Sequence, residues 1–101
     1  MTTFEGDLVL KEDTVFDENI EVNGNIICEG GTWNIKAWNI EAWNIKARNI
    51  EAWGIEAWGI EAWNIEFYAY CISFSSLKCK SWKGIRKNHI IKCLEKEIEI
   101  L

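Results

Sequence analysis

The side chains that could act as nucleophiles, bases or metal ligands are few and widely spaced. Cys28, Cys71, Cys79 and Cys93 contain no Cys-x-x-Cys pair, and His89 is the only histidine. Zinc binding by Cys79, His89 and Cys93 is a remote alternative, because their spacing does not suit a compact tetrahedral site. We therefore expect most of the cysteines to be reduced, buried thiols in the place of alanine, a surface or packing role for His89, and no metal or cofactor.

Carboxylates recur at regular intervals, which is typical of a solvated face and not of a catalytic pair. Glu41, Glu51, Glu56, Glu61 and Glu66 all fall in the same phase of a five-residue spacing. Catalysis would need a nucleophile beside a base, two carboxylates in different environments, or a glycine-rich phosphate loop. None of these patterns is convincing in the chain, so we do not expect an enzyme.

A five-residue repeat from Trp33 to Phe67 is the element that must position these side chains. It reads Trp-Asn-Ile-x-Ala in seven consecutive units, with Arg48 replacing one Trp and Gly54 and Gly59 replacing Asn. In an α-helix each unit would turn the isoleucine by about 140°, and in a flat strand isoleucine would change faces in every unit. A short strand followed by a corner avoids both problems. The repeat therefore predicts a β-solenoid with isoleucine and alanine inside.

The tryptophans are expected to face outward, because a narrow bore cannot hold the guanidinium of Arg48 or a stack of indoles. With four units in a coil, residues twenty apart would stack at about 4.8 Å. The predicted stacks are Trp33 with Trp53, Trp38 with Trp58, Trp43 with Trp63, and Arg48 with Tyr68. The same register places Lys36 beside Glu56, Lys46 beside Glu66, and Glu41 beside Glu61. One acidic strip, Glu41 with Glu61, would remain.

The Asn-Ile pair, as in Asn39-Ile40, resembles the pentapeptide-repeat family. The resemblance covers residues 33–67, and it departs from the family where Trp stands two places before the large residue. It implies a right-handed, four-sided parallel β-helix of the kind that bacteriophages and mobile elements carry. Some members of that family resemble duplex DNA in shape and charge and bind topoisomerases, so the resemblance also implies a DNA mimic.

The chain is expected to form one all-β domain with three regions. Residues 1–32 should form irregular first coils, residues 33–83 the pentapeptide-type coils, and residues 84–101 a C-terminal cap. Gly30-Gly31 would permit the change of pitch between the first two regions. The sequence has no apolar run long enough for a membrane helix, and its acidic start lacks the zones of a signal peptide. We therefore expect a cytoplasmic protein with no membrane contact.

Charge is distributed unevenly along the chain. Residues 1–32 hold eight acidic side chains against Lys11, whereas residues 68–94 hold six basic side chains and no acidic one. The formal net charge is −5. This polarity suits a partner of opposite or mixed charge.

The leading hypothesis is a non-enzymatic, phage- or mobile-element-type binding protein. It would inhibit a host or defence protein, such as a nucleic-acid enzyme, by occupying its surface or by mimicking nucleic acid. The expected partner-binding residues are Trp33, Trp38, Trp43, Arg48, Trp53, Trp58, Trp63, Glu41 and Glu61.

Three alternatives stay open. The tryptophan ladders could only stiffen and shield a thin barrel. The solenoid could self-associate end to end into a homodimer or filament. Direct binding of single-stranded nucleic acid through Lys78 to Lys92, with Tyr68, Tyr70 and Trp82, ranks last because the chain as a whole is acidic.

Overall fold

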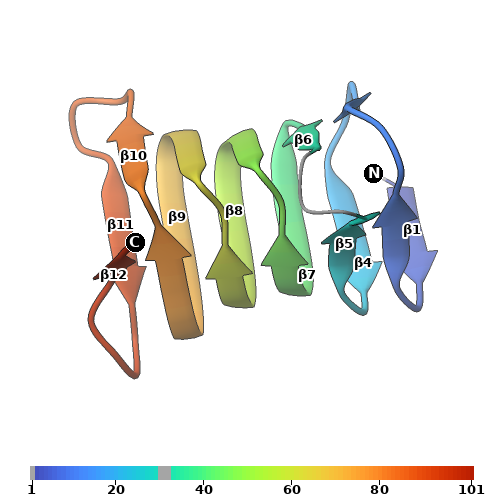
Figure 1. Cartoon of the computed structure of the whole chain (residues 1–101). Coiled ribbons are helices and arrows are strands. Elements are labelled where there is room, and N and C mark those ends of the chain that lie inside the picture. The colour runs from blue at the N-terminus through green and yellow to red at the C-terminus, as the bar shows by residue number, and fades with distance from the viewer. Residues whose placement is uncertain (1, 30–32) are drawn as a thin grey trace.

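The chain folds as a parallel β-solenoid of about six turns, as a computed structural model of residues 2–29 and 33–101 describes it (Figure 1). The coils are stacked side by side, with β1 at one end and β10, β11 and β12 at the other. The predicted all-β solenoid in a single domain is confirmed. Gly30-Gly31, where we expected a change of pitch, lies outside the described residues. No described segment forms a helix that could cross a membrane.

Each coil crosses three flat faces, which we name after the side chains that they display. The glutamate face consists of β1 (Thr2–Glu5), β4 (Ile20–Asn23), residues 39–42 of β7 (Asn39–Lys46), 54–57 of β8 (Asn49–Glu61), 70–73 of β9 (Asn64–Cys79), and β11 (Ile90–Cys93). The ion-pair face consists of β2 (Leu8–Leu10), β5 (Ile26–Cys28), residues 44–46 of β7, 59–61 of β8, 76–78 of β9, and β12 (Glu99–Ile100). The asparagine face consists of β3 (Thr14–Val15), β6 (Asn34–Lys36), residues 49–52 of β8, 64–67 of β9, and β10 (Ser81–Gly84).

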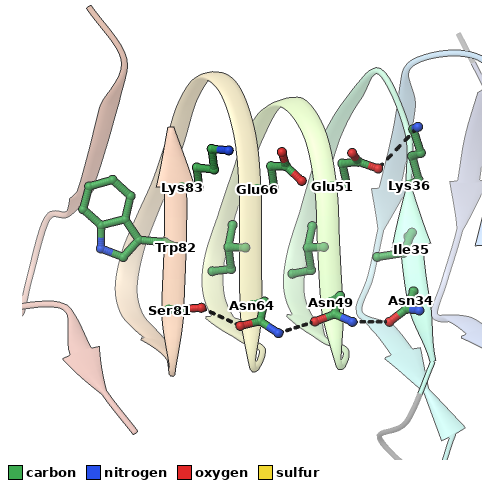
Figure 2. A pocket seen from close by; sticks show the side chains of 12 residues that line it. Asn34, Ile35, Lys36, Asn49, Glu51, Asn64, Glu66, Ser81, Trp82 and Lys83 are labelled. Carbon is green, nitrogen blue, oxygen red and sulfur yellow. Dashed lines mark hydrogen bonds and ion pairs between the residues drawn. The ribbon is translucent and has the colours of Figure 1, made fainter. Parts of the chain in front are cut away.

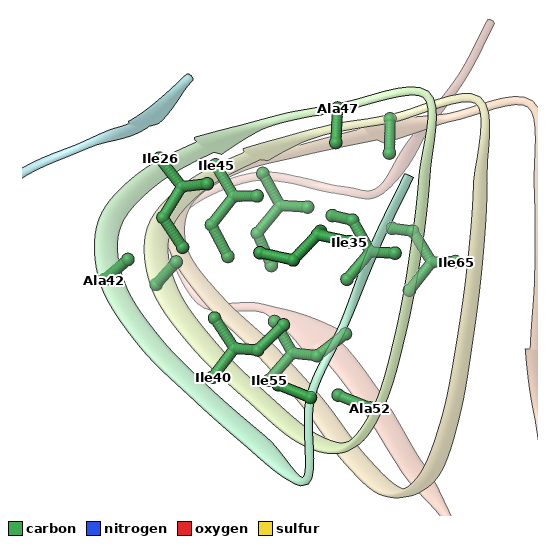
Figure 3. Close-up of a cluster of buried hydrophobic side chains, with 14 of the residues drawn as sticks. Ile26, Ile35, Ile40, Ala42, Ile45, Ala47, Ala52, Ile55 and Ile65 are labelled. Atoms are coloured by element: carbon green, nitrogen blue, oxygen red, sulfur yellow. The ribbon is translucent and has the colours of Figure 1, made fainter. Parts of the chain in front are cut away.

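The predicted number of sides is wrong. Ile35 lies beside Ile50, and Ile50 lies beside Ile65, so a central coil takes fifteen residues and three repeat units. The four-sided coil of twenty residues is therefore replaced by a triangle, which Figure 3 shows in cross-section. A five-residue period is compatible with any whole number of units per coil, because every unit looks the same to its neighbour. Packing in the bore must decide the number.

Isoleucine and alanine fill the triangular bore, as predicted. Every repeat isoleucine from Ile35 to Ile65 has at most 2% of its surface exposed, and every repeat alanine has at most 5%. Three isoleucines and three alanines of each central coil point inward, and like residues stack from coil to coil (Figure 3). Burial of one isoleucine side chain contributes about 1.5–3 kcal/mol. The repeated core is thus the main source of stability.

The coil widens where larger side chains enter the core. Phe67 takes an alanine position beside Ala52 and is fully buried. The register of β8 against β9 then shifts between Ala52 and Gly54, and again between Ala57 and Gly59. Each shift adds one residue to β9 at a corner of the coil, which gives the chain the extra length that a wider coil needs.

The cysteines are interior residues. Cys28, Cys71 and Cys79 are buried free thiols, and Cys93 is partly buried. Cys93 continues an alanine column through Ser73, but Cys71 stands in an isoleucine column beside Ile55. Burial, with a smaller effect of Cys79, raises the pKa of the Cys71 thiol to about 12. The thiols therefore act as small apolar core groups. The predicted burial is confirmed for three of them, and Cys71 replaces isoleucine instead of alanine.

His89 packs against aromatic rings near the C-terminal end. Its ring centroid lies 5.7 Å from that of Phe67 and 5.8 Å from that of Trp82. Its Nδ1 lies 2.7 Å from the carbonyl oxygen of Arg86. In the described part of the chain, Cys79, His89 and Cys93 form no cluster that could hold a metal ion.

Candidate functional site: the glutamate face and its aromatic ridges

The tryptophans stand at the three corners of the solenoid, where successive coils place them in ridges. The Trp53 ridge, between the asparagine and glutamate faces, consists of Trp38, Trp53 and Tyr68. The Trp58 ridge, between the glutamate and ion-pair faces, consists of Trp43, Trp58 and Phe74. The Arg48 ridge, between the ion-pair and asparagine faces, consists of Trp33, Arg48, Trp63 and Lys80.

The predicted outward orientation of the tryptophans is confirmed for five of the six in the repeat. Trp38, Trp43, Trp53, Trp58 and Trp63 are between 44% and 62% exposed. Trp33 is partly buried and packs against the core. Such exposure of large apolar side chains in rows is unusual for a surface that contacts only water.

The predicted stacking partners are wrong, because they assumed four units per coil. The observed ring contacts in the ridges join residues of adjacent coils: Trp38, fifteen residues before Trp53, stacks on it with centroids 6.4 Å apart and an interplanar angle of 19°. Arg48 does not lie over Tyr68; its guanidinium carbon is 5.0 Å from the centroid of Trp63. Lys80, one coil beyond Trp63 in the same ridge, adds a second cation, since its Nζ is 4.3 Å from the centroid of the same ring.

The glutamate face displays a column of like charges. Glu21 lies beside Glu41, and Glu41 lies beside Glu56, in the register of the parallel ladder. Neighbouring strands are about 4.8 Å apart, so the three carboxylates follow one another at close range. Beyond Glu56 the column continues with Ile72 and reaches its first cation only at Lys92. No ion pair within the described chain involves these three glutamates, a set that we call the glutamate column.

On the other two faces, each glutamate in the corresponding column has a lysine beside it in the ladder, and Glu66 lies between Glu51 and Lys83. Lys36 Nζ lies 3.3 Å from Glu51 Oε2 on the asparagine face. On the ion-pair face, Lys46 Nζ lies 3.7 Å from Glu61 Oε2, and Lys78 Nζ lies 3.6 Å from Glu99 Oε2. The predicted pairing of Glu41 with Glu61 is therefore wrong. Glu61 lies on a different face, between two lysines.

Tyr70 borders the glutamate column. Burial raises the pKa of its hydroxyl, and the carboxylates of Glu56 and Glu41 raise it further. Its ring lies over Gly54, where an added Cβ would come within 2.3 Å of a ring carbon. Glycine replaces the repeat asparagine at this position because the ring occupies the space of a side chain.

The Trp58 ridge and the glutamate column line the same small hollow. Its volume is ≈ 150 Å³, and its lining includes Glu41, Trp43, Glu56, Trp58 and Phe74. Indole faces attract ammonium and guanidinium groups, and carboxylates accept strong hydrogen bonds from them. The hollow can therefore receive lysine or arginine side chains.

The asparagine face has a different character, which Figure 2 shows in three parallel rows. Asn49 Nδ2 donates to Asn34 Oδ1 at 2.7 Å, and Asn64 Nδ2 donates to Asn49 Oδ1 at 2.8 Å. Ser81 continues the row by donating its hydroxyl proton to Asn64 Oδ1. The hollow over this face is larger, at ≈ 480 Å³. Its amides bond to one another, however, so this ladder stabilises the stack and has fewer groups free for a ligand.

The basic residues of the C-terminal region do not share a surface. Lys78 lies on the ion-pair face, Lys80 on the Arg48 ridge and Lys83 on the asparagine face. Tyr70 lies on the glutamate face and Tyr68 on the Trp53 ridge, whereas Trp82 lies on the asparagine face. The residues that we considered for single-stranded nucleic acid are thus spread over all three sides.

Sequence reasoning missed several members of the site. Glu21 and Phe74 lie outside the regular repeat, and Tyr70 lies where the repeat decays. Glu56 was expected beside Lys36 and instead continues the glutamate column. The signal that could have found it is the fifteen-residue separation of Glu41 and Glu56, which becomes informative only when the coil length is known.

Comparison of the chain with family models, with curated proteins and with solved structures finds no match. The pentapeptide-repeat resemblance therefore depends on the repeat alone.

Proposed function

We propose that this chain is a non-enzymatic binding protein that docks its glutamate face on a basic surface of a protein partner. One observation carries the proposal: among the described residues, no cation forms an ion pair with the glutamate column, which is bordered on both sides by exposed aromatic ridges. Like charges placed directly opposite one another in a sheet are destabilising. Lysine or arginine side chains of a partner would relieve this repulsion.

The two ridges give such a partner more than charge. Tryptophan and tyrosine are the residues that most often anchor protein interfaces, because they bury a large area with few rotatable bonds. Here they are stacked on a solenoid whose backbone is tied by a continuous parallel ladder. Little ordering is then required on binding, which favours affinity.

The finer proposal concerns the class of partner. The pentapeptide-repeat resemblance and the net charge of −5 support a phage- or mobile-element-type inhibitor that acts in the cytoplasm. Its target would be a host or defence protein that uses a basic surface to hold nucleic acid. Occupation of that surface by the glutamate face would exclude the nucleic acid.

Capture from a nuclease-treated bacterial lysate tests the proposal when variants of different faces are compared. In the first variant, Glu41→Lys and Glu56→Lys reverse the glutamate column. Its control carries Glu51→Lys and Glu61→Lys, which change the net charge equally on the other two faces. A second variant, Trp38→Ala with Trp58→Ala, removes one indole from each ridge beside the glutamate face.

We expect wild type and the control to retain the same protein, identified by mass spectrometry, and both glutamate-face variants to lose it. Circular dichroism must show that every variant keeps the wild-type β-sheet spectrum. Equal retention by all folded variants would contradict the proposal. Loss of the captured protein on nuclease treatment would also contradict it, because the contact would then run through nucleic acid.

A further inference from the structure

Both ends of the solenoid present strand edges without a partner in the described chain. At one end, β1 pairs only with β4, β2 only with β5 and β3 only with β6. At the other end, β10, β11 and β12 pair only with β9. Figure 1 places these two sets at opposite ends of the stack. An open edge carries N–H and C=O groups that can pair with another strand.

The N-terminal edge directs specific backbone groups outward. Leu8 and Phe16 donate their N–H groups to carbonyl oxygens of the following coil. Backbone groups alternate in direction along a strand, so Val9 and Val15 direct theirs away from the solenoid. Substitutions at these two positions can therefore change the edge without removing a hydrogen bond inside the molecule.

The backbone groups that the C-terminal edge directs outward complement those of the N-terminal edge. Leu94 and Leu101 donate their N–H groups back to β9. By the same alternation, Cys93 and Ile100 direct theirs away from the solenoid. The two ends thus present the two sides of one parallel ladder, as successive coils do inside the molecule.

The first and last coils contain similar numbers of residues, and both contain more residues than a central coil. Thr2 pairs with Ile20, a step of eighteen residues, and Tyr70 pairs with Ile90, a step of twenty. Central coils take fifteen. Partly buried apolar side chains also lie against the core at both ends, namely Phe4, Leu8 and Phe16 at the first and Ile91, Cys93 and Ile98 at the last. Contact between the ends would bury these groups further.

The charges of the two ends favour contact between an N-terminal end and a C-terminal end. Residues 2–18 contain six acidic side chains and one lysine, whereas residues 81–101 contain five basic and three acidic ones. Two N-terminal ends would repel each other, and an N-terminal end would attract a C-terminal one.

We propose that a second copy of this chain is the partner of these edges, and that its N-terminal edge continues the parallel ladder at the C-terminal edge of the first. Such a contact joins different patches of the two copies and does not close on itself, so it produces linear oligomers. The contact uses the ends of the solenoid and leaves the glutamate face free.

Two edge variants test the proposal by complementation. Val9→Pro removes an N–H at the N-terminal edge, and Ile100→Pro removes one at the C-terminal edge, while neither N–H bonds inside the molecule. Val9→Thr and Ile100→Thr are the matched controls that keep the N–H groups. Sedimentation velocity at low salt, over a range of protein concentrations, gives the mass of each species.

We expect the mass of wild type and of both threonine controls to rise with concentration to at least twice the monomer mass. Each proline variant alone should stay monomeric. Their equimolar mixture should form a dimer and nothing larger, because each partner then offers one intact edge. Added salt should reduce assembly of wild type, since opposite charges contribute.

Several outcomes would overturn the proposal. These are a wild type that is monomeric at all concentrations, a mixture that stays monomeric, or a proline variant that dimerises alone through an isologous contact. Circular dichroism checks folding, and Val15→Pro on β3 replaces Val9→Pro if that variant unfolds. A folded Val9→Pro monomer that still captures a partner through its glutamate face would separate this proposal from the proposed function.

Discussion

The glutamate face and the ion-pair face are built from the same repeat and meet along the Trp58 ridge, yet they differ in their outward charges. The first displays Glu21, Glu41 and Glu56 in sequence. The second alternates lysine and glutamate, with Lys46 paired to Glu61. Their inward positions are the same isoleucine and alanine columns. The comparison teaches that the fold depends on the inward residues and leaves one outward residue per unit free to serve function.

The difference in charge energy between the two faces is small compared with the free energy contributed by burial of the core. An exposed ion pair contributes about 0–1 kcal/mol, and a like-charged pair opposes folding by a similar amount. Burial of a single isoleucine contributes more than either. The solenoid can therefore carry an uncompensated acidic column without losing its fold, which is a condition for using that column in binding.

Truncation of a core isoleucine should cause the largest loss of stability, and the loss should be equal behind the two faces. Ile55→Ala removes a fully buried side chain behind the glutamate face, and Ile60→Ala removes its counterpart behind the ion-pair face. Each should lower the free energy of unfolding by about 2–5 kcal/mol, because a cavity forms in a core that cannot collapse. Urea denaturation followed by tryptophan fluorescence measures both. A large difference between the two would show that the faces do not share one core.

Substitution of glycine by alanine should reduce stability by different amounts on the two faces. At Gly54 an added Cβ meets ring carbons of Tyr70, whereas at Gly59 it meets the amide oxygen of Asn44 at 2.5 Å. The first contact is with carbons of a bulky aromatic ring, whereas the second is with the end of a movable amide side chain. We expect Gly54→Ala to cost about 1–3 kcal/mol of stability and Gly59→Ala clearly less. Equal losses in urea denaturation would contradict the packing of Tyr70 over Gly54.

Charge reversal should have opposite signs on the two faces. Glu56→Lys puts a cation beside Glu41 and should stabilise the fold by about 0.5–1 kcal/mol at low ionic strength. Glu61→Lys puts a third cation between Lys46 and Lys78 and should destabilise it by about the same amount. Thermal unfolding at low salt checks the signs. Both effects should shrink at 1 M salt, where the Debye length is about 3 Å. Shifts of the same sign at low salt would refute the contrast between the faces.

The sequence predicts the cross-section's contents but not its shape. The spacing of isoleucine and alanine was enough to place them inside and most tryptophans outside, and both placements are confirmed. The number of units per coil could not follow, because identical units stack equally well at any multiple of five. The wrong number then displaced every stacking partner, from Trp38 and Trp53 to Arg48 and Trp63.

The candidate site was harder to predict than the fold for the same reason. The tryptophans are visible in the sequence, but their grouping into ridges depends on coil length. Glu21 and Tyr70 reach the glutamate face only because the end coils are longer than the central ones. The lengths of the end coils are set by residues outside the regular repeat, through their packing and the register shifts that they cause. The five-residue period of the sequence contains no information on these shifts.

Tyr70 gives the finest test of the contrast, because its hydroxyl senses the glutamate column. Burial and the carboxylates of Glu56 and Glu41 raise its pKa above 10.0, the ordinary value. The folded protein then holds this proton to higher pH than the unfolded chain, so the stability that Tyr70 contributes is lost as the pH rises above about 10. In a Tyr68→Phe background, tyrosinate absorbance reports Tyr70 alone. We expect Glu56→Gln to lower the titration midpoint and to reduce the alkaline loss of stability, and Glu61→Gln, on the ion-pair face, to leave both unchanged. Equal shifts from the two substitutions would mean that Tyr70 responds to the overall charge of the molecule and not to the column beside it.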